Sequence, residues 1–200
     1  MGCWLMAWNK LGSTTLTSYS ETIQYDVNSD DFMMFMIHTI PDSTVHTSFQ
    51  FNNDTGTSYN NNYATNGGTN YTDTNQTKLR ISPDASTVPE LFVGFIINKA
   101  SEEKLIISHK IQQNTAGAGN APNRLEVVGK WTNTSSQISN IKLMENNQAG
   151  GFNTDSNFTT LGSDGVEELN VQDGAIYYDT DLNKEYVLYN NTWTEVWKYI

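Results

Sequence analysis

The sequence predicts an all-β fold: a jelly-roll-like antiparallel β-sandwich over residues 1–165, followed by a small C-terminal β-hairpin or meander module over residues 166–200. Many short stretches alternate apolar and polar residues, and turn-forming Gly, Pro, Asn and Asp separate them. Polarity comes mostly from Asn, Thr, Ser and Gln, which are poor helix formers. Only 16% of the residues are charged, and no stretch of ten or more residues shows a helical period.

The most strongly patterned stretch is Leu91–Ile111, which predicts two strands joined by a polar turn at residues 100–103. The first strand is apolar on both faces, which is typical of the middle of a buried sheet. Gly94 within it indicates a bend or a second backbone that passes close by. The second strand alternates, so we expect one face in the core and the other in solvent. The core set would be Leu105, Ile107 and Ile111, and the solvent set Lys104, Ser108 and Lys110.

The same alternation predicts the remaining strands. In chain order they are 4–10, 13–19, 22–27, 32–40, 45–51, 79–81, 125–131, 138–143 and 158–161, then 166–171, 175–178, 186–189 and 193–197. The strand Phe32–Ile40 is also apolar on both faces, so we expect it, with its His38, to be buried. A turn at Gly162–Gly165 separates the two modules.

The longest polar segment, Asn52–Gln76, is expected to be a loop that carries scattered tyrosines, with Asn66-Gly67 as the turn of a small hairpin. Its tyrosines offer stacking faces and its asparagines offer hydrogen bonds, which together could bind a glycan. The alternative is that the tyrosines fold back over the sheet. The candidate glycan-binding residues are Tyr59, Tyr63, Tyr71 and Asn70.

Charge and cysteine content exclude several classes of protein. The formal net charge of −11 argues against binding to nucleic acid and to anionic membrane surfaces, both of which need clustered Lys and Arg. The single cysteine, Cys3, rules out an internal disulfide framework. No apolar stretch is long enough to cross a bilayer, so we expect no membrane insertion.

No catalytic or metal-ligating constellation stands out, so the sequence predicts neither an enzyme nor a cofactor. His38 and His109 lie in apolar strand patterns, which favours packed core positions for both. His46 has no Cys or His at metal-ligand spacing. Asp179–Asn183 and Asp54 could suggest calcium, but ordinary turn chemistry explains both. We therefore expect no metal site.

Several stretches resemble a family of structural proteins from tailed viruses of bacteria and archaea. They are Trp8–Leu16 (WNKLGSTTL), Phe49–Tyr59 (FQFNNDTGTSY), Gln113–Trp131 (QNTAGAGNAPNRLEVVGKW), Ile138–Gly165 and the tail Asp173–Val196 (DGAIYYDTDLNKEYVLYNNTWTEV). No single motif is specific, but their order is informative. The resemblance implies a jelly-roll-like sandwich, a place in the virion and no enzymatic role. It leaves tail fibre, head decoration and coat subunit open.

The sequence therefore predicts a virion subunit that assembles with copies of itself, as a trimer or larger assembly, and with other virion proteins, while polar loops face outward. Neighbouring subunits would then cover exposed strand edges and the aromatic tail. The candidate contact residues are Tyr186, Tyr189, Trp193 and Trp197, with packing inside their own small sheet as the alternative. A carbohydrate-binding adhesion module that recognises host surface glycan is the second prediction.

Overall fold

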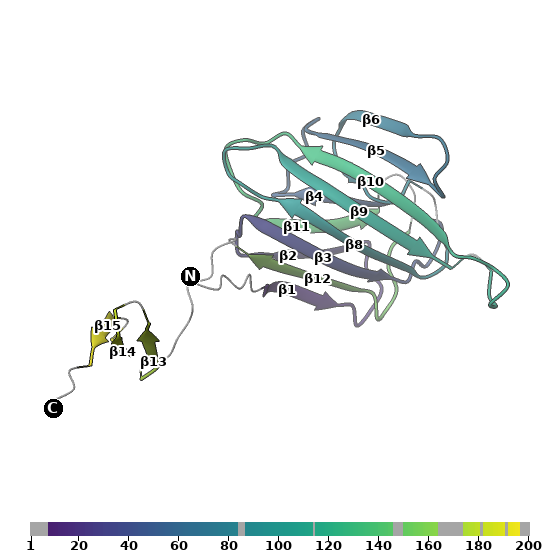
Figure 1. Ribbon diagram of the computed structural model, residues 1–200. Helices are drawn as coiled ribbons and strands as arrows, with labels where there is room; N and C mark the ends of the chain where they lie inside the picture. Colours follow the sequence, from purple (N-terminus) through teal and green to yellow (C-terminus); the bar gives the residue numbers. More distant parts are fainter. Residues whose placement is uncertain are drawn as a thin grey trace. The chain divides into compact units, whose positions relative to one another are not determined.

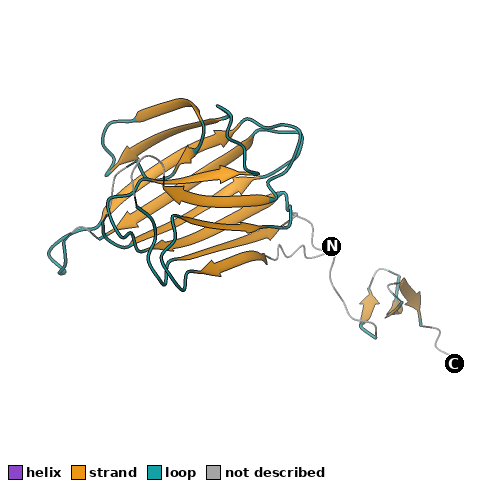
Figure 2. Cartoon of the chain, turned by 180° about the vertical axis from the view of Figure 1, so that it is seen from behind, coloured by secondary structure: helices purple, strands orange, loops and turns teal. Residues whose placement is uncertain are grey.

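The computed structural model describes residues 8–83, 87–113, 115–145, 150–163, 174–180, 182–190 and 192–196. These residues form strands and turns and no helix, as the sequence predicts (Figure 2). The chain divides into two compact units, Met6–Gly165 and a second unit that contains Val166–Ile200.

The larger unit is an antiparallel β-sandwich, jelly-roll-like in architecture (Figure 1). One sheet has eight strands, in the spatial order β1 (Asn9–Thr15), β12 (Asn157–Ser163), β3 (Phe32–Thr39), β8 (Glu90–Ile97), β9 (Lys104–Gln112), β10 (Asn123–Trp131), β5 (Tyr59–Thr65) and β6 (Tyr71–Gln76). The other has four, in the order β2 (Thr22–Asp26), β11 (Asn140–Glu145), β4 (Thr47–Phe51) and β7 (Leu79–Arg80).

Aromatic side chains between the two sheets form the centre of the core. The ring of Phe35 on β3 meets that of Phe49 on β4 edge to face at 5.0 Å, and Phe158 on β12 lies 5.7 Å from Phe49. Such contacts combine a large buried area with a favourable ring geometry. They show that the sheets pack face to face with one shared apolar layer.

The predicted hairpin forms, but its faces are reversed. Strands β8 and β9 pair with Leu91 opposite Ile111 and Phe95 opposite Ile107, around a turn at Ala100. The expectation that β8 is buried on both faces is wrong, because its outward residues are exposed. The expected core set of β9 is likewise exposed and its lysine face is buried. The exposed side chains are Leu91, Val93, Phe95, Leu105, Ile107 and Ile111.

Gly94 accounts for this orientation. A Cβ at Gly94 would lie 2.3 Å from the ring of Phe35 and 2.3 Å from the carbonyl oxygen of Ile107, so its missing side chain leaves room for that ring. Of the two alternatives that the sequence leaves open at Gly94, a bend or a close backbone, the close backbone is the one found. Because Phe35 must reach Phe49 in the core, the Gly94 face of β8 turns inward. Directly paired residues share a face, so Ser108 turns inward with Gly94.

Hydrogen bonds compensate the two lysines that this orientation buries. The Lys110 ammonium donates to Glu90 Oε1 and Ser82 Oγ at 2.8 Å each, and to Gln112 Oε1 at 2.5 Å. The Lys104 ammonium donates to three backbone carbonyl oxygens and lies over the ring of Trp131. A buried ammonium is tolerated when each of its three N–H groups has an acceptor.

The histidine predictions also fail for two positions. His38 on β3 and His109 on β9 are exposed on the outward side of the eight-stranded sheet. In each strand, buried and exposed residues alternate around the histidine. The residues next to each histidine in the sequence point inward and fill the core. These histidines were expected in the core because the apolar strand faces that carry them were expected to face the core.

The polar segment after Asn52 is more ordered than predicted. Residues 59–65 and 71–76 form β5 and β6, which extend the eight-stranded sheet. The hairpin turn at Asn66-Gly67 is confirmed, since both residues adopt positive φ angles of 52° and 71°. Strand β5 pairs with β10 along its whole length, which holds the segment in place.

The C-terminal unit contains a three-stranded meander of β13 (Ile176–Asp179), β14 (Lys184–Tyr189) and β15 (Thr192–Glu195). Asn183 and Asn190 take positive φ angles in its two turns. Only one of its described apolar side chains, Leu188, is buried. The predicted strand 166–171 lies outside the described residues.

Candidate functional site: an apolar outer face

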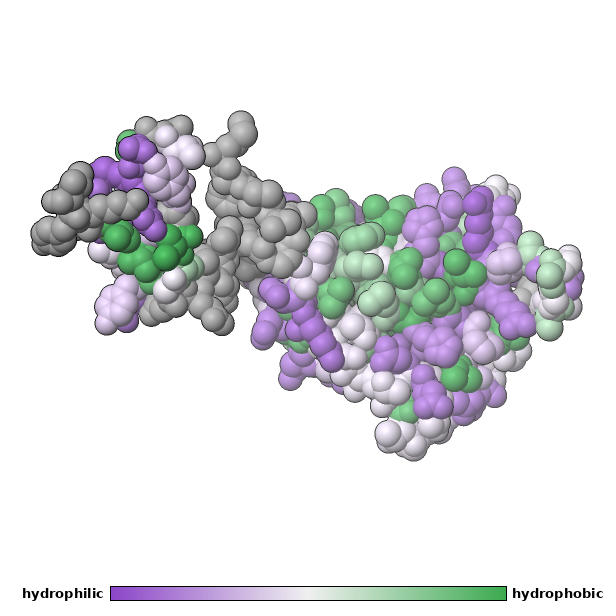
Figure 3. Space-filling model, turned by 60° about the horizontal axis from the view of Figure 1, so that its bottom comes forward, coloured by the Kyte–Doolittle hydropathy of each residue, from purple (hydrophilic) through white to green (hydrophobic). Residues whose placement is uncertain are grey.

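The outward side of the eight-stranded sheet carries an extended apolar surface, interrupted by the exposed His38 and His109. We call this surface the apolar outer face. Each of its side chains is 36–53% exposed. Hydrophobic side chains gather on this side of the sandwich unit, with hydrophilic ones around them (Figure 3). Its members are Trp8, Met36, Leu91, Val93, Phe95, Leu105, Ile107, Ile111 and Val128.

This surface is too large to be incidental. Nine such side chains, a third to a half exposed, present on the order of 800 Å², whereas the largest apolar patch on a typical monomer covers roughly 300–600 Å². It also lacks negative charge at its centre: the outward positions of β8 and β9 hold no acidic residue, in a chain of net charge −11. Contiguous apolar surfaces of this kind mark interaction sites.

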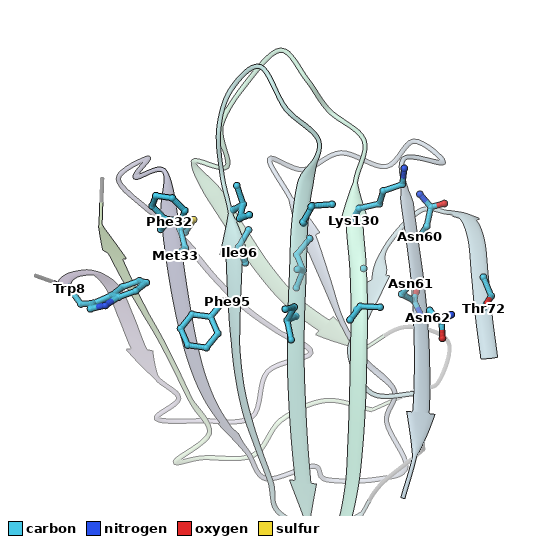
Figure 4. Close-up of a pocket in the computed structure, with 16 residues that line it drawn as sticks. Trp8, Phe32, Met33, Asn60, Asn61, Asn62, Thr72, Phe95, Ile96 and Lys130 are labelled. Atoms are coloured by element: carbon cyan, nitrogen blue, oxygen red, sulfur yellow. The ribbon is translucent and has the colours of Figure 1, made fainter. Parts of the chain in front are cut away.

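A groove of about 670 Å³ lies in this face (Figure 4). The rings of Trp8 and Phe95, 6.2 Å apart in an edge-to-face contact, stand along one side. Aliphatic side chains from β9 and β10 form the floor: Leu105, Ile107 and Val128. Polar side chains of β5 and β6 stand on the other side: Asn60, Asn62 and Thr72.

Charged groups at the rim of the face are paired. Lys130 Nζ lies 2.6 Å from Glu103 Oε2, and Arg124 lies 4.0 Å from Glu126. These pairs are exposed, so they contribute little to stability. Their effect is to keep the border of the apolar outer face close to neutral on the side of β10.

Tyr59, the first candidate for glycan binding, is a core residue. It is fully buried, its ring stacks on Trp131 at 6.3 Å, and its hydroxyl accepts a hydrogen bond from the Phe51 amide at 3.0 Å. Burial raises the pKa of the Tyr59 hydroxyl well above its usual range. The expectation of an exposed Tyr59 is therefore wrong. The Tyr59 side chain points toward the four-stranded sheet, which agrees with the alternative that the tyrosines pack against the sheet.

The other glycan candidates lie together at the β5–β6 hairpin. The rings of Tyr63 and Tyr71 stack at 5.5 Å with an angle of 22°, and Tyr71 is 56% exposed. Asn70 is exposed just before β6. This cluster can offer one aromatic face and one amide, and glycan binding by these three residues stays a prediction.

The candidate subunit contacts of the tail divide between the faces of the small meander. Trp193 pairs directly with Leu188, so the two share a face, and Tyr186 lies on that same face two residues before Leu188. Tyr189 points to the opposite face and is 66% exposed. Trp197 lies outside the described residues.

Neither proposed calcium loop gains support from its geometry. Asp54 accepts hydrogen bonds from Trp131 Nε1 at 2.7 Å and from the Gly56 amide at 2.8 Å, which is turn chemistry. Partial burial would raise the pKa of Asp54, but these hydrogen bonds and one from Ser58 outweigh it and lower that pKa. Asp179 accepts from the Leu182 amide in a similar turn, and Asp181 lies outside the described residues.

Within the part of the chain that the structure describes, no three His, Cys, Asp or Glu side chains gather in a way that could hold a metal ion. The described residues also contain no helix of the length and hydropathy that a membrane span needs.

The apolar outer face is the feature that sequence reasoning missed. In a two-layer sandwich each strand has one face in the core, so a strand that is apolar on both faces must leave one of them uncovered. Phe32–Ile40 and Leu91–Ile97 both have this pattern. In a predicted two-layer sandwich, these two strands have more apolar faces than the core can cover. That excess was the signal in the sequence for an exposed apolar face.

Comparison of the chain with protein-family models, with curated proteins and with solved structures finds no match.

Proposed function

We propose that this chain is a non-enzymatic structural protein that assembles with copies of itself. The observation that carries the proposal is the apolar outer face, which leaves nine large hydrophobic side chains in contact with water. Covering such a face releases the water at its surface, and this is the main driving force of protein association. The resemblance of the sequence stretches to viral structural proteins supports a virion as the setting of that assembly, with the chain as tail fibre, decoration or coat subunit.

The size of the apolar outer face fits this role. On the order of 800 Å² per partner is what a standard specific interface buries. The rest of the surface favours separation instead, because copies with a net charge of −11 repel one another. Association through the uncharged centre of the sheet avoids most of that repulsion.

Sedimentation equilibrium of the purified full chain tests the proposal. We expect a defined oligomer at micromolar concentration and ordinary salt, with tighter association as salt rises, because salt screens the repulsion between acidic copies. A monomer across that range would contradict a structural role based on self-assembly.

Carbohydrate binding is the second candidate, favoured by the stacked and exposed Tyr71 beside Asn70. A pyranose ring can pack its C–H face on an aromatic ring while its hydroxyls bond to an amide. We expect hits on a glycan array that Tyr71→Ala removes and that Tyr19→Ala keeps, since Tyr19 is an exposed tyrosine elsewhere (47%). An array without hits for the unmodified chain would contradict this candidate.

A further inference from the structure

We propose that the occupant of the apolar outer face is the same face of a second copy, in a two-fold symmetric dimer in which the Trp8–Phe95 ridge of each copy enters the groove of the other. This inference rests on the proposed self-assembly and specifies its partner and geometry. It makes the dimer the building block of any larger assembly.

The ridge and the groove have matching chemistry. The ridge consists of two aromatic rings in contact, with Trp8 36% and Phe95 51% exposed. The floor of the groove consists of Leu105, Ile107 and Val128, each about half exposed. Aromatic rings that pack into an aliphatic recess bury the most apolar area per side chain, and aromatic residues dominate interface energetics.

Their placement on one face is what a two-fold contact requires. In an isologous interface, residue i of one copy contacts residue j of the other, and j of the first contacts i of the second. Phe95 lies directly opposite Ile107 across β8 and β9, so ridge and floor are immediate neighbours. A two-fold axis that passes between these two residues places each Phe95 over the floor of the partner's groove. Both grooves of the dimer are then filled, so no further copy can bind at this site.

The face also selects a second copy over other occupants by its charge. The outward positions of β8 and β9 carry no acidic residue, Lys or Arg, although they include His109, and the rim charges of β10 are paired. Few like charges therefore oppose one another when two identical faces meet. The polar wall of Asn60, Asn62 and Thr72 is neutral, so it adds no like charge to the contact. A cationic peptide would find no complementary charge at the centre of this face.

The test compares two charge-introducing variants with a matched control by sedimentation equilibrium. Phe95→Asp places a carboxylate on the ridge, and Val128→Asp places one in the floor. Both residues are about half exposed, so the folded monomer tolerates the change, and circular dichroism with a thermal melt verifies this. Tyr19→Asp introduces the same charge at a similarly exposed aromatic residue outside the face. We expect the unmodified chain and Tyr19→Asp to be dimers, and each face variant to weaken dimerisation roughly 30-fold or more.

The outcomes separate this inference from the proposed function. If the unmodified chain assembles but both face variants assemble as tightly, the outer face is not the interface and this inference fails, while self-assembly stands. A trimer would overturn the two-fold contact in the same way. A monomeric unmodified chain would overturn the proposed function itself, even if the face then bound a peptide or a lipid vesicle.

Discussion

The buried ion pair between Lys110 and Glu90 shows the limit of residue-scale prediction. Lysine is almost always exposed, so the sequence predicts an outward Lys110. In the structure its side chain is 1% exposed and that of Glu90 0%. The acceptors come from three separate places in the chain: Glu90, Gln112 and Ser82. Local sequence pattern does not show that they converge, and so it does not show that the charge can be buried.

Removing the lysine of this buried pair is expected to lower the free energy of unfolding far more than removing the lysine of an exposed pair. Lys110→Met leaves the Glu90 carboxylate buried without its counter-charge, which lowers the free energy of unfolding by about 3–5 kcal/mol. Lys130→Met, which breaks the exposed pair with Glu103, is the control and should change it by only ~0–1 kcal/mol. Urea denaturation measures both. Equal effects for the two variants would contradict the high cost expected for a Glu90 carboxylate left buried without Lys110.

At the scale of elements, the sequence predicts where strands lie better than which way they face. The strands around Leu91–Ile111 and the Asn66-Gly67 turn are confirmed. Alternation fixes which residues share a face, but it does not say which face meets the other sheet. That choice depends on Phe35 above Gly94, a contact between residues 59 positions apart. The glycan candidates divide for the same reason, because Tyr59 turns into the core while Tyr71 stays exposed.

Gly94 is therefore expected to be intolerant of even one added methyl group. A Cβ there would lie 2.3 Å from both the Phe35 ring and the Ile107 carbonyl oxygen, and the backbone oxygen cannot move without breaking the β8–β9 pairing. Gly94→Ala should lower the free energy of unfolding by about 1–3 kcal/mol. Gly119→Ala, where nothing lies within 4 Å, is the control and should stay within ~0.5 kcal/mol of the unmodified chain. A neutral Gly94→Ala would argue against the close packing that turns this face inward.

At the scale of the whole molecule, two surfaces compete as the site of self-association. The sequence directs attention to the aromatic tail, where Tyr189 and Trp193 are exposed on the small meander. The structure adds the apolar outer face on the separate unit Met6–Gly165, which holds the whole described sandwich core. The sequence predicts self-association but not this surface, because the residues of the surface were assigned to the core.

The oligomeric state of a chain that ends at Gly165, measured by native mass spectrometry beside the full chain, tests the central claim most directly. This shortened chain keeps the sandwich and the apolar outer face and removes every aromatic residue of the tail. We expect it to fold and to form the same dimer as the full chain. A folded monomer from the shortened chain, beside an oligomeric full chain, would assign the association to the tail and contradict the role of the apolar outer face.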